Sequence, residues 1–157
     1  ILAMPATTGY RLPTEAEWAW SARHAGPVTR FPWGDAMPPP RGSANYADET
    51  AAGMVPYHII DYSDTFRGPA PAASFEANQL GLYDLAGNVA EWVHDHYSAE
   101  RITTALTDPA GPRTGEFHVI RGSSFMHGRF SELRWTYRDY GDEPRPDVGF
   151  RIARFVE

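Results

Sequence analysis

The chain has 157 residues, of which 42% are hydrophobic and 13% aromatic, a composition that predicts one folded domain with an aromatic core. Its net charge of −6 argues against nucleic acid as the main partner, because phosphate recognition needs a basic surface. All 14 basic residues are arginines, which excludes lysine Schiff-base chemistry. The chain has no cysteine, which excludes disulfides, thiolate metal sites and cysteine nucleophiles. No apolar run approaches the roughly 18 residues of a membrane helix, so we expect no membrane insertion.

The first predicted element is a helix over residues 14–24. Thr14 as N-cap and Glu17 three residues later form a capping box. Trp18 and Ala22 lie one turn apart and are expected to face the core. The Ala-Gly-Pro sequence at 25–27 predicts where the helix stops.

Residues 27–80 are predicted to form long loops, because they hold many glycines and prolines and show no sustained hydrophobic period. Loops of this length inside a compact domain need an internal staple, and metal is the usual one where disulfides are absent. Three later segments alternate with period two and predict antiparallel strands near 89–95, 117–121 and 148–153. A weaker alternation over 133–138 predicts a fourth strand. The residues alone therefore indicate an α+β fold.

Five sequence phrases occur in order along the chain: YRLPTEAEW at 10–18, FPWGD at 31–35, GLYDLAGNVAEW at 81–92, IRGSSF at 120–125 and VGFR at 148–151. Their content and order resemble the formylglycine-generating enzyme, or sulfatase-modifying factor, family. The resemblance implies an irregular C-type-lectin-like fold with short antiparallel strands, few helices and long ordered loops. It also implies that residues 1–157 are the C-terminal part of one such domain. The first residues show neither an initiator methionine nor a leader, so we expect a piece of a longer protein.

Enzymes of this family hold two calcium ions with oxygens from loops. The residues that match the first calcium site are Asn45 and Asp64 by side chain, with Tyr46 and Phe66 by carbonyl. Those that match the second are Asp84 and Glu91 by side chain, with Gly87 and Val89 by carbonyl. The second spacing alone places two carboxylates around a glycine-containing turn, which suits a hard cation. The alternative is that Asp84 caps a turn and Glu91 is a solvated strand residue.

The family's enzymes oxidise a substrate cysteine with a pair of active-site cysteines that bind copper. In the phrase that begins at Arg121, these two positions fall on His127 and Glu132. Imidazole and carboxylate cannot replace two soft thiolates on copper(I), and neither forms a mixed disulfide with a substrate. We therefore expect no formylglycine-forming oxidase and no copper.

His127 and Glu132 remain candidates for a new catalytic site, with the histidine as general base and the carboxylate orienting it. With a second histidine they could also begin a non-haem iron site, and the plausible donors are His118 and the pair at 94 and 96. The alternative for that pair is a half-buried strand with satisfied histidines. Iron thus stays open as the cofactor of an alternative function, a metal-dependent oxidoreductase or maturation enzyme.

Aromatic and arginine side chains crowd the segment from 124 to 140, and such residues dominate binding hot spots. The predicted ligand-binding residues are Ser124, Phe125, His127, Arg129, Glu132, Arg134, Trp135, Tyr137 and Arg138. The alternative is that the aromatics belong to the core and the arginines pair with carboxylates such as Asp142, Glu143 and Asp147. Variable proteins that share the lectin-like fold display a ligand-binding surface on the corresponding segment.

These observations predict a calcium-stabilised binding or accessory module, a pseudoenzyme within a larger bacterial protein. The expected partner is a protein or peptide, which includes the N-terminal portion of the same domain. The expected compartment is the cell envelope or periplasm rather than the cytoplasm.

Overall fold

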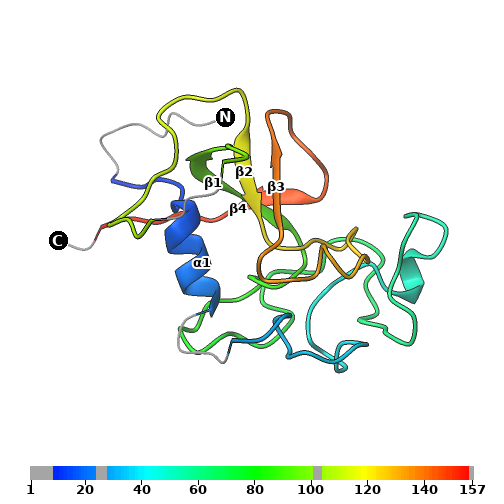
Figure 1. Ribbon diagram of the computed structural model, residues 1–157. Helices are drawn as coiled ribbons and strands as arrows, with labels where there is room; N and C mark the ends of the chain where they lie inside the picture. Colours follow the sequence, from blue (N-terminus) through cyan, green and yellow to red (C-terminus); the bar gives the residue numbers. More distant parts are fainter. Residues whose placement is uncertain (1–8, 24–27, 101–103, 156–157) are drawn as a thin grey trace.

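A computed structural model describes residues 9–23, 28–100 and 104–155. In chain order the elements are helix α1 (Glu15–Arg23), the short 3-10 helix η1 (Glu49–Ala51) and strands β1 (Ala90–His96), β2 (His118–Arg121), β3 (Arg138–Gly141) and β4 (Val148–Phe150). Long loops connect them, and Figure 1 shows α1 beside a small sheet with the loops gathered on the other side. The predicted α+β fold is confirmed. Within the described residues, no helix is both long and apolar enough to cross a membrane.

The four strands form one mixed sheet in the order β3-β2-β1-β4. Strand β1 pairs antiparallel with β2, and β2 pairs antiparallel with β3. Strand β4 pairs parallel with β1, with Val148 opposite Ala90, so the antiparallel prediction was wrong for this strand. The chain reaches β4 by a crossover from the far edge of the sheet, and this path sets the direction in which β4 enters.

The capping box at the start of α1 is formed as predicted. The Glu17 amide donates to Thr14 Oγ1 at 3.2 Å, and the Thr14 amide donates to the Glu17 carboxylate at 2.8 Å. Trp18 and Ala22 are buried, as their spacing predicted. The predicted stop at 25–27 lies outside the described residues.

Strand β1 is covered on both faces, which makes it the centre of the fold. On one face Val93 packs in a cluster with Trp18 of α1 and Val119 of β2. On the other face Trp92 packs with Leu12 and Ile120. Burial of an aromatic side chain as large as Trp18 contributes about 3 kcal/mol, so this double packing fixes β1 and the loops that leave it.

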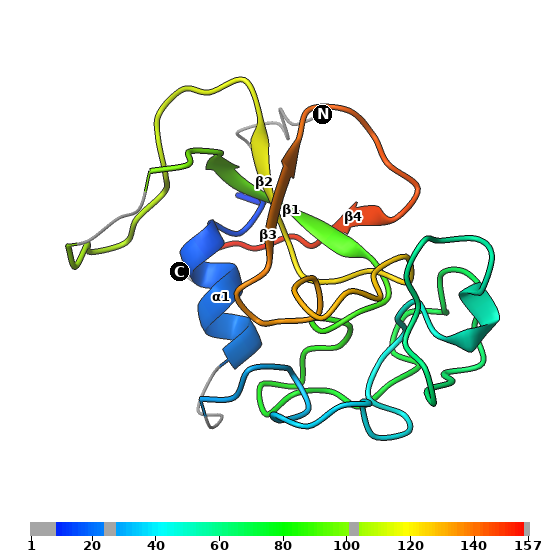
Figure 2. The ribbon, with the colours of Figure 1, turned by 45° about the vertical axis from the view of Figure 1, so that its right-hand side comes forward.

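The loops between α1 and β1 form a lobe with an apolar core of its own, in which Phe31, Tyr46, Ile59, Tyr62 and Leu133 are buried. Figure 2 shows this lobe beside the lower edge of the sheet, with the segment between β2 and β3 running into it. Three polar side chains, Asn45, Asp48 and Asp64, are also buried there.

The fourth strand predicted over 133–138 was wrong except at its last residue, because the observed strand β3 begins at Arg138. The amides of Leu133 and Tyr137 donate to carbonyls three or four residues earlier, which is a turn pattern. The guanidinium of Arg121 also occupies the carbonyls of Trp135 and Tyr137. Because these local bonds use the backbone groups that a strand would pair, the alternation does not become a ladder.

Candidate functional site

The loop that follows β2 carries a buried polar cluster around His127, one of the two residues that the sequence resemblance aligns with a cysteine position. His127 is 8% exposed, and its Nδ1 accepts a hydrogen bond from the Ser124 amide at 3.0 Å. Since an amide can only donate, Nδ1 carries the lone pair and Nε2 carries the proton. Burial lowers the pKa of His127, and this outweighs the opposing charges of Glu132 and Asp147. The imidazole is therefore neutral at pH 7.

An arginine links two carboxylates beneath this histidine. Arg145 contacts Asp139 at 2.6 Å and Asp147 at 3.0 Å, and the Ser124 hydroxyl donates to Asp147 at 3.0 Å. Burial alone would raise the pKa of Asp147, but the hydrogen bonds and charge of Arg145 lower it below the ordinary value. The same two carboxylates raise the pKa of Arg145. The cluster is thus a closed ion network of one guanidinium and two carboxylates.

This arrangement differs from a Ser-His-Asp triad in the order of its bonds. In a triad the histidine lies between serine and aspartate, whereas here the serine hydroxyl donates directly to Asp147. Ser124 is fully buried, and the ring nitrogen of His127 that could accept a proton already faces the Ser124 amide. The contacts of the described residues support a structural role for this trio better than nucleophilic catalysis.

Glu132, the second residue that the resemblance aligns with a cysteine position, closes a turn. Its Oε2 accepts from the Arg129 amide at 2.9 Å, and its carbonyl accepts from the Ser123 hydroxyl at 2.9 Å. The contacts of the described residues include no hydrogen bond between this carboxylate and His127. The predicted orientation of His127 by Glu132 is therefore not a direct contact in this structure.

The residues predicted for the first calcium site lie together in the loop lobe. Asp64 accepts the amides of Tyr46 at 2.8 Å and Phe66 at 2.9 Å, so three of the four residues meet at one carboxylate. Asn45 donates through Nδ2 to the Gly68 carbonyl, while its Oδ1 is buried and has no hydrogen-bond partner among the described residues. Carboxylate and amide oxygens are the donor chemistry that calcium takes, and this orphaned amide oxygen needs a partner.

The charge balance of this lobe also fits a cation. The pKa of Asp64 is raised to about 6, chiefly by burial and also by the charge of neighbouring Asp48, against two backbone hydrogen bonds that lower it. Asp48 itself is fully buried, and its Oδ2 accepts the Asp64 amide at 2.7 Å. Two buried carboxylates side by side need a positive charge, which a calcium ion held by Asn45 and Asp64 would supply.

The residues predicted for the second calcium site fit a cation less well. Asp84 Oδ1 is buried without a partner among the described residues, and its Oδ2 accepts the Ala73 amide at 2.8 Å. Glu91 already accepts from Arg151 at 2.6 Å and from the Trp18 indole at 2.7 Å. Glu91 is buried, so it is not the solvated strand residue of the alternative. The second calcium site stays a prediction. One of its two carboxylates, that of Glu91, already forms an ion pair with Arg151.

The alternative non-haem iron site has no assembled ligand set in the parts of the chain that the structure describes, where no three His, Asp or Glu side chains are placed to hold a metal. His94, His96 and His118 line one cavity, and His127 is not among the residues that line it. His127 packs edge-on against Tyr137 instead.

The predicted ligand-binding surface divides into an outward and an inward part. Met126, Arg129, Phe130 and Arg134 are exposed, with Phe130 at 49%. Arg138 turns inward to bind Glu15 at 2.8 Å and lies over the Tyr97 ring. Trp135 packs half-buried against the cluster of Trp18 and Val93. The alternative of core aromatics and paired arginines thus holds for this inward half.

Sequence reasoning missed several members of these sites. Asp48 completes the acidic pair of the loop lobe, and no motif pointed to it. Arg145 was not predicted, although its neighbour Asp147 was named as a partner for arginine. Tyr57 is 52% exposed and stacks under Arg129, with the guanidinium 3.9 Å from the ring centroid. A lone tyrosine in a loop gives no pattern from which this contact could be read.

Comparison with known proteins gives a consistent family. Residues 3–156 match the model of the sulfatase-modifying factor enzyme 1-like domain. The chain is 41% identical over 122 residues to the formylglycine-generating enzyme of Thermomonospora curvata, covering 75% of this chain and 39% of that protein. It is 38% identical over 150 residues to the enzyme of Streptomyces coelicolor, covering 92% and 46%. The chain therefore spans less than half the length of these two relatives.

The fold agrees as well. Treponema denticola variable protein 1 superposes with a TM-score of 0.73 at 28% identity, covering 92% of this chain and 47% of that one. The predicted C-type-lectin-like fold is thereby confirmed. From the matched model, the identities and the shared fold, this chain belongs to the formylglycine-generating enzyme, or sulfatase-modifying factor, family.

Proposed function

We propose that this chain is a calcium-stabilised binding or accessory module of its family and does not form formylglycine. The observation that carries the proposal concerns the contacts of His127 and Glu132, the two residues that match the family's cysteine positions. His127 fixes the Ser124 backbone, and Glu132 closes its own turn. Both side chains serve the local structure in which a family enzyme would hold reactive thiols.

Copper-dependent cysteine oxidation needs soft sulfur for the metal and a thiol for the substrate. With no cysteine in its sequence, this chain supplies neither. The neutral, buried His127 cannot replace a cysteine as copper ligand, because its Nδ1 lone pair already accepts a hydrogen bond from the Ser124 amide.

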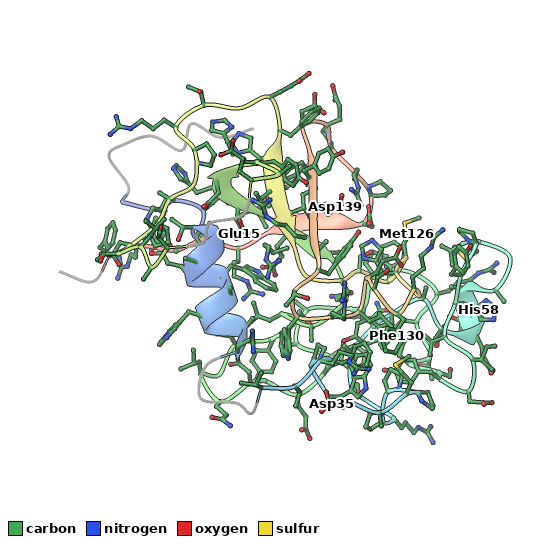
Figure 3. The ribbon with its side chains drawn as sticks, viewed as in Figure 1. Glu15, Asp35, His58, Met126, Phe130 and Asp139 are labelled. Atoms are coloured by element: carbon green, nitrogen blue, oxygen red, sulfur yellow. The ribbon has the colours of Figure 1, made fainter. Side chains whose placement is uncertain are left out.

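An exposed surface of aromatic, methionine and arginine side chains lies mainly on the same loop as His127. We call the residues Tyr57, Met126, Arg129 and Phe130 the Phe130 surface. Phe130 packs edge-on against buried Phe31, and Arg129 lies over Tyr57, so the exposed rings are held in place from below. Figure 3 shows Met126 and Phe130 on the loop lobe with His58, away from Glu15 of α1. Rigid aromatic and arginine side chains are the usual anchors for a protein or peptide partner.

The backbone connects this surface to the first calcium site. The Ala47 amide donates to the His127 carbonyl at 3.1 Å, and the Ala47 carbonyl accepts the Ile59 amide at 2.7 Å. Ala47 follows the calcium residues Asn45 and Tyr46 directly. A calcium ion at that site would therefore hold the loop from which both sides of the Phe130 surface are supported.

The test uses a random peptide display library, with the calcium-loaded chain as bait. We expect enriched peptides that bind wild type and lose at least about tenfold in affinity with Phe130→Ala, as hot-spot residues do. The matched control is Phe150→Ala, a phenylalanine that is 65% exposed on the sheet edge. An equal loss of peptide affinity in Phe130→Ala and Phe150→Ala contradicts the binding function. A library that yields no enriched peptides contradicts it as well.

A second assay tests the absence of oxidase activity independently. The chain is incubated with copper and a cysteine peptide, and aldehyde formation is followed by mass spectrometry. We expect no aldehyde above the level of copper alone. Copper-dependent turnover by the chain would overturn the proposal whatever the peptide display shows.

A further inference from the structure

Two histidines face each other where strands β1 and β2 meet. His96 ends β1 and His118 begins β2, and they are directly opposite in the antiparallel register. Opposed residues of an antiparallel pair project to the same face of the sheet. Their ring centroids are 4.3 Å apart, with the rings inclined by 32°. The fold thus brings together two imidazoles that are 22 positions apart in sequence.

Both rings hold a buried nitrogen without a partner. The Nδ1 atoms of His96 and His118 are inaccessible and form no hydrogen bond with any described residue. A buried polar atom left unsatisfied costs about 1–3 kcal/mol, so a pair of them in contacting side chains needs an explanation. Imidazole nitrogen is the commonest protein ligand of transition metals.

The surroundings give the pair an open side and a closed side. A cavity of about 620 Å³ is lined by both histidines and by His94, together with Arg11 and Arg113. On the closed side Gly115 packs on His96, where an added Cβ would lie 2.9 Å from the His96 Cβ. The covering loop therefore needs glycine at this position in order to lie on the ring.

We propose that His96 and His118 form a binding site for a divalent transition metal of the zinc, nickel and copper(II) class. Imidazole is a preferred ligand of these ions and a poor one for calcium. The described residues hold no cluster of three acidic or histidine ligands, so the chain supplies two ligands and water or a solute from the cavity supplies the others. His94 lies at the rim of the same cavity.

This site differs in position and chemistry from the proposed calcium site. The calcium residues offer oxygens and lie in the loop lobe, whereas the histidine pair lies at the end of the β1–β2 ladder. The proposal adds a second kind of metal to the module and requires no reaction. It also holds if the Phe130 surface binds nothing.

The experiment is a zinc titration of the tag-free chain by calorimetry, in buffer with saturating calcium so that oxygen sites are filled. We expect one zinc ion per chain, and a cobalt(II) spectrum with visible bands typical of nitrogen ligation. His118→Gln should lower zinc affinity at least about tenfold, and His96→Gln should do the same. The matched control is His58→Gln, a histidine of the loop lobe, which should leave the affinity unchanged (Figure 3).

Circular dichroism without zinc shows whether each variant folds. If one of the two glutamine variants fails to fold, the other carries the test alone. Absence of zinc uptake by wild type would mean that a buried water satisfies the two nitrogens, and it would overturn the proposal. Equal affinity in wild type and in both glutamine variants would overturn it as well.

Discussion

The imidazole of His127 is held by the backbone of Ser124, whose amide donates to Nδ1 at 3.0 Å. The buried ring is thereby fixed against the backbone of its own loop. The Ser124 hydroxyl extends the contact to Asp147 at 3.0 Å, and Arg145 pairs with that carboxylate. The loop is thus stabilised by hydrogen bonds and an ion pair.

Acid should destabilise the domain through His127. Its pKa is lowered in the folded state by burial, so between the ordinary value near 6.5 and the lower folded value the unfolded chain binds more protons. The contribution of His127 to stability is therefore full above about pH 6.5 and is lost as the pH falls towards the folded pKa. His127→Asn should flatten this slope, because an amide oxygen can accept from Ser124 without titrating. Chemical denaturation from pH 7.5 to 5 measures it, and an unchanged slope in the variant would contradict the assignment.

Calcium removal should lower the melting temperature through the first calcium site. Asp64 and Asp48 are buried side by side, and Asn45 Oδ1 has no partner among the described residues, so loss of a cation leaves these charges uncompensated. Differential scanning fluorimetry with and without chelator measures the shift. Asp64→Asn should abolish the response to calcium. A full response in Asp64→Asn together with none in Asp84→Asn would move the ion to the second site.

Arg151→Ala should cost about 3 kcal/mol of unfolding free energy, because it leaves buried Glu91 without its charge partner. The comparison is Arg11→Ala, which breaks a partly exposed pair with Glu17 and should cost less than Arg151→Ala, about 1 kcal/mol. Urea unfolding measures both. If calcium restores Arg151→Ala to wild-type stability, Glu91 can bind the ion. If the two variants lose the same unfolding free energy, the contacts described for Glu91 are contradicted.

Gly128→Ala should destabilise the Phe130 surface. A Cβ at this position would lie 2.4 Å from the Tyr57 carbonyl oxygen, so the segment under Phe130 would have to move away from the loop at 57–58. Forced shifts of this kind cost about 1–3 kcal/mol. The matched control is Gly68→Ala, where the added methyl meets no atom within 4 Å. Thermal melts of the two variants should differ by several degrees, and equal melts would show that the two loops are not in contact.

Features that depend on neighbours in sequence were predictable. The capping box of Thr14 and Glu17 spans three residues, and the alternation around Trp92 and Val119 marks strands that pack on both sides of one sheet. The ordered phrases indicated the family, and the lack of cysteine could be read from the sequence alone. Where both partners are local, or where a residue type is missing from the whole chain, the sequence is sufficient.

Pairings across the chain were decided only by the tertiary structure. Glu91 meets Arg151 at a separation of 60 residues, and Arg138 reaches back 123 residues to Glu15. Each arginine could have remained exposed or paired elsewhere, since its long side chain accepts many carboxylates at similar energy. The parallel direction of β4, the exposure of Phe130 and the opposition of His96 and His118 depend in the same way on the path of the loops. Sequence by itself determined the local elements, the family and the loss of its thiols; packing decided which charges are neutralised and which surfaces remain open, because these follow from where the backbone lies in space.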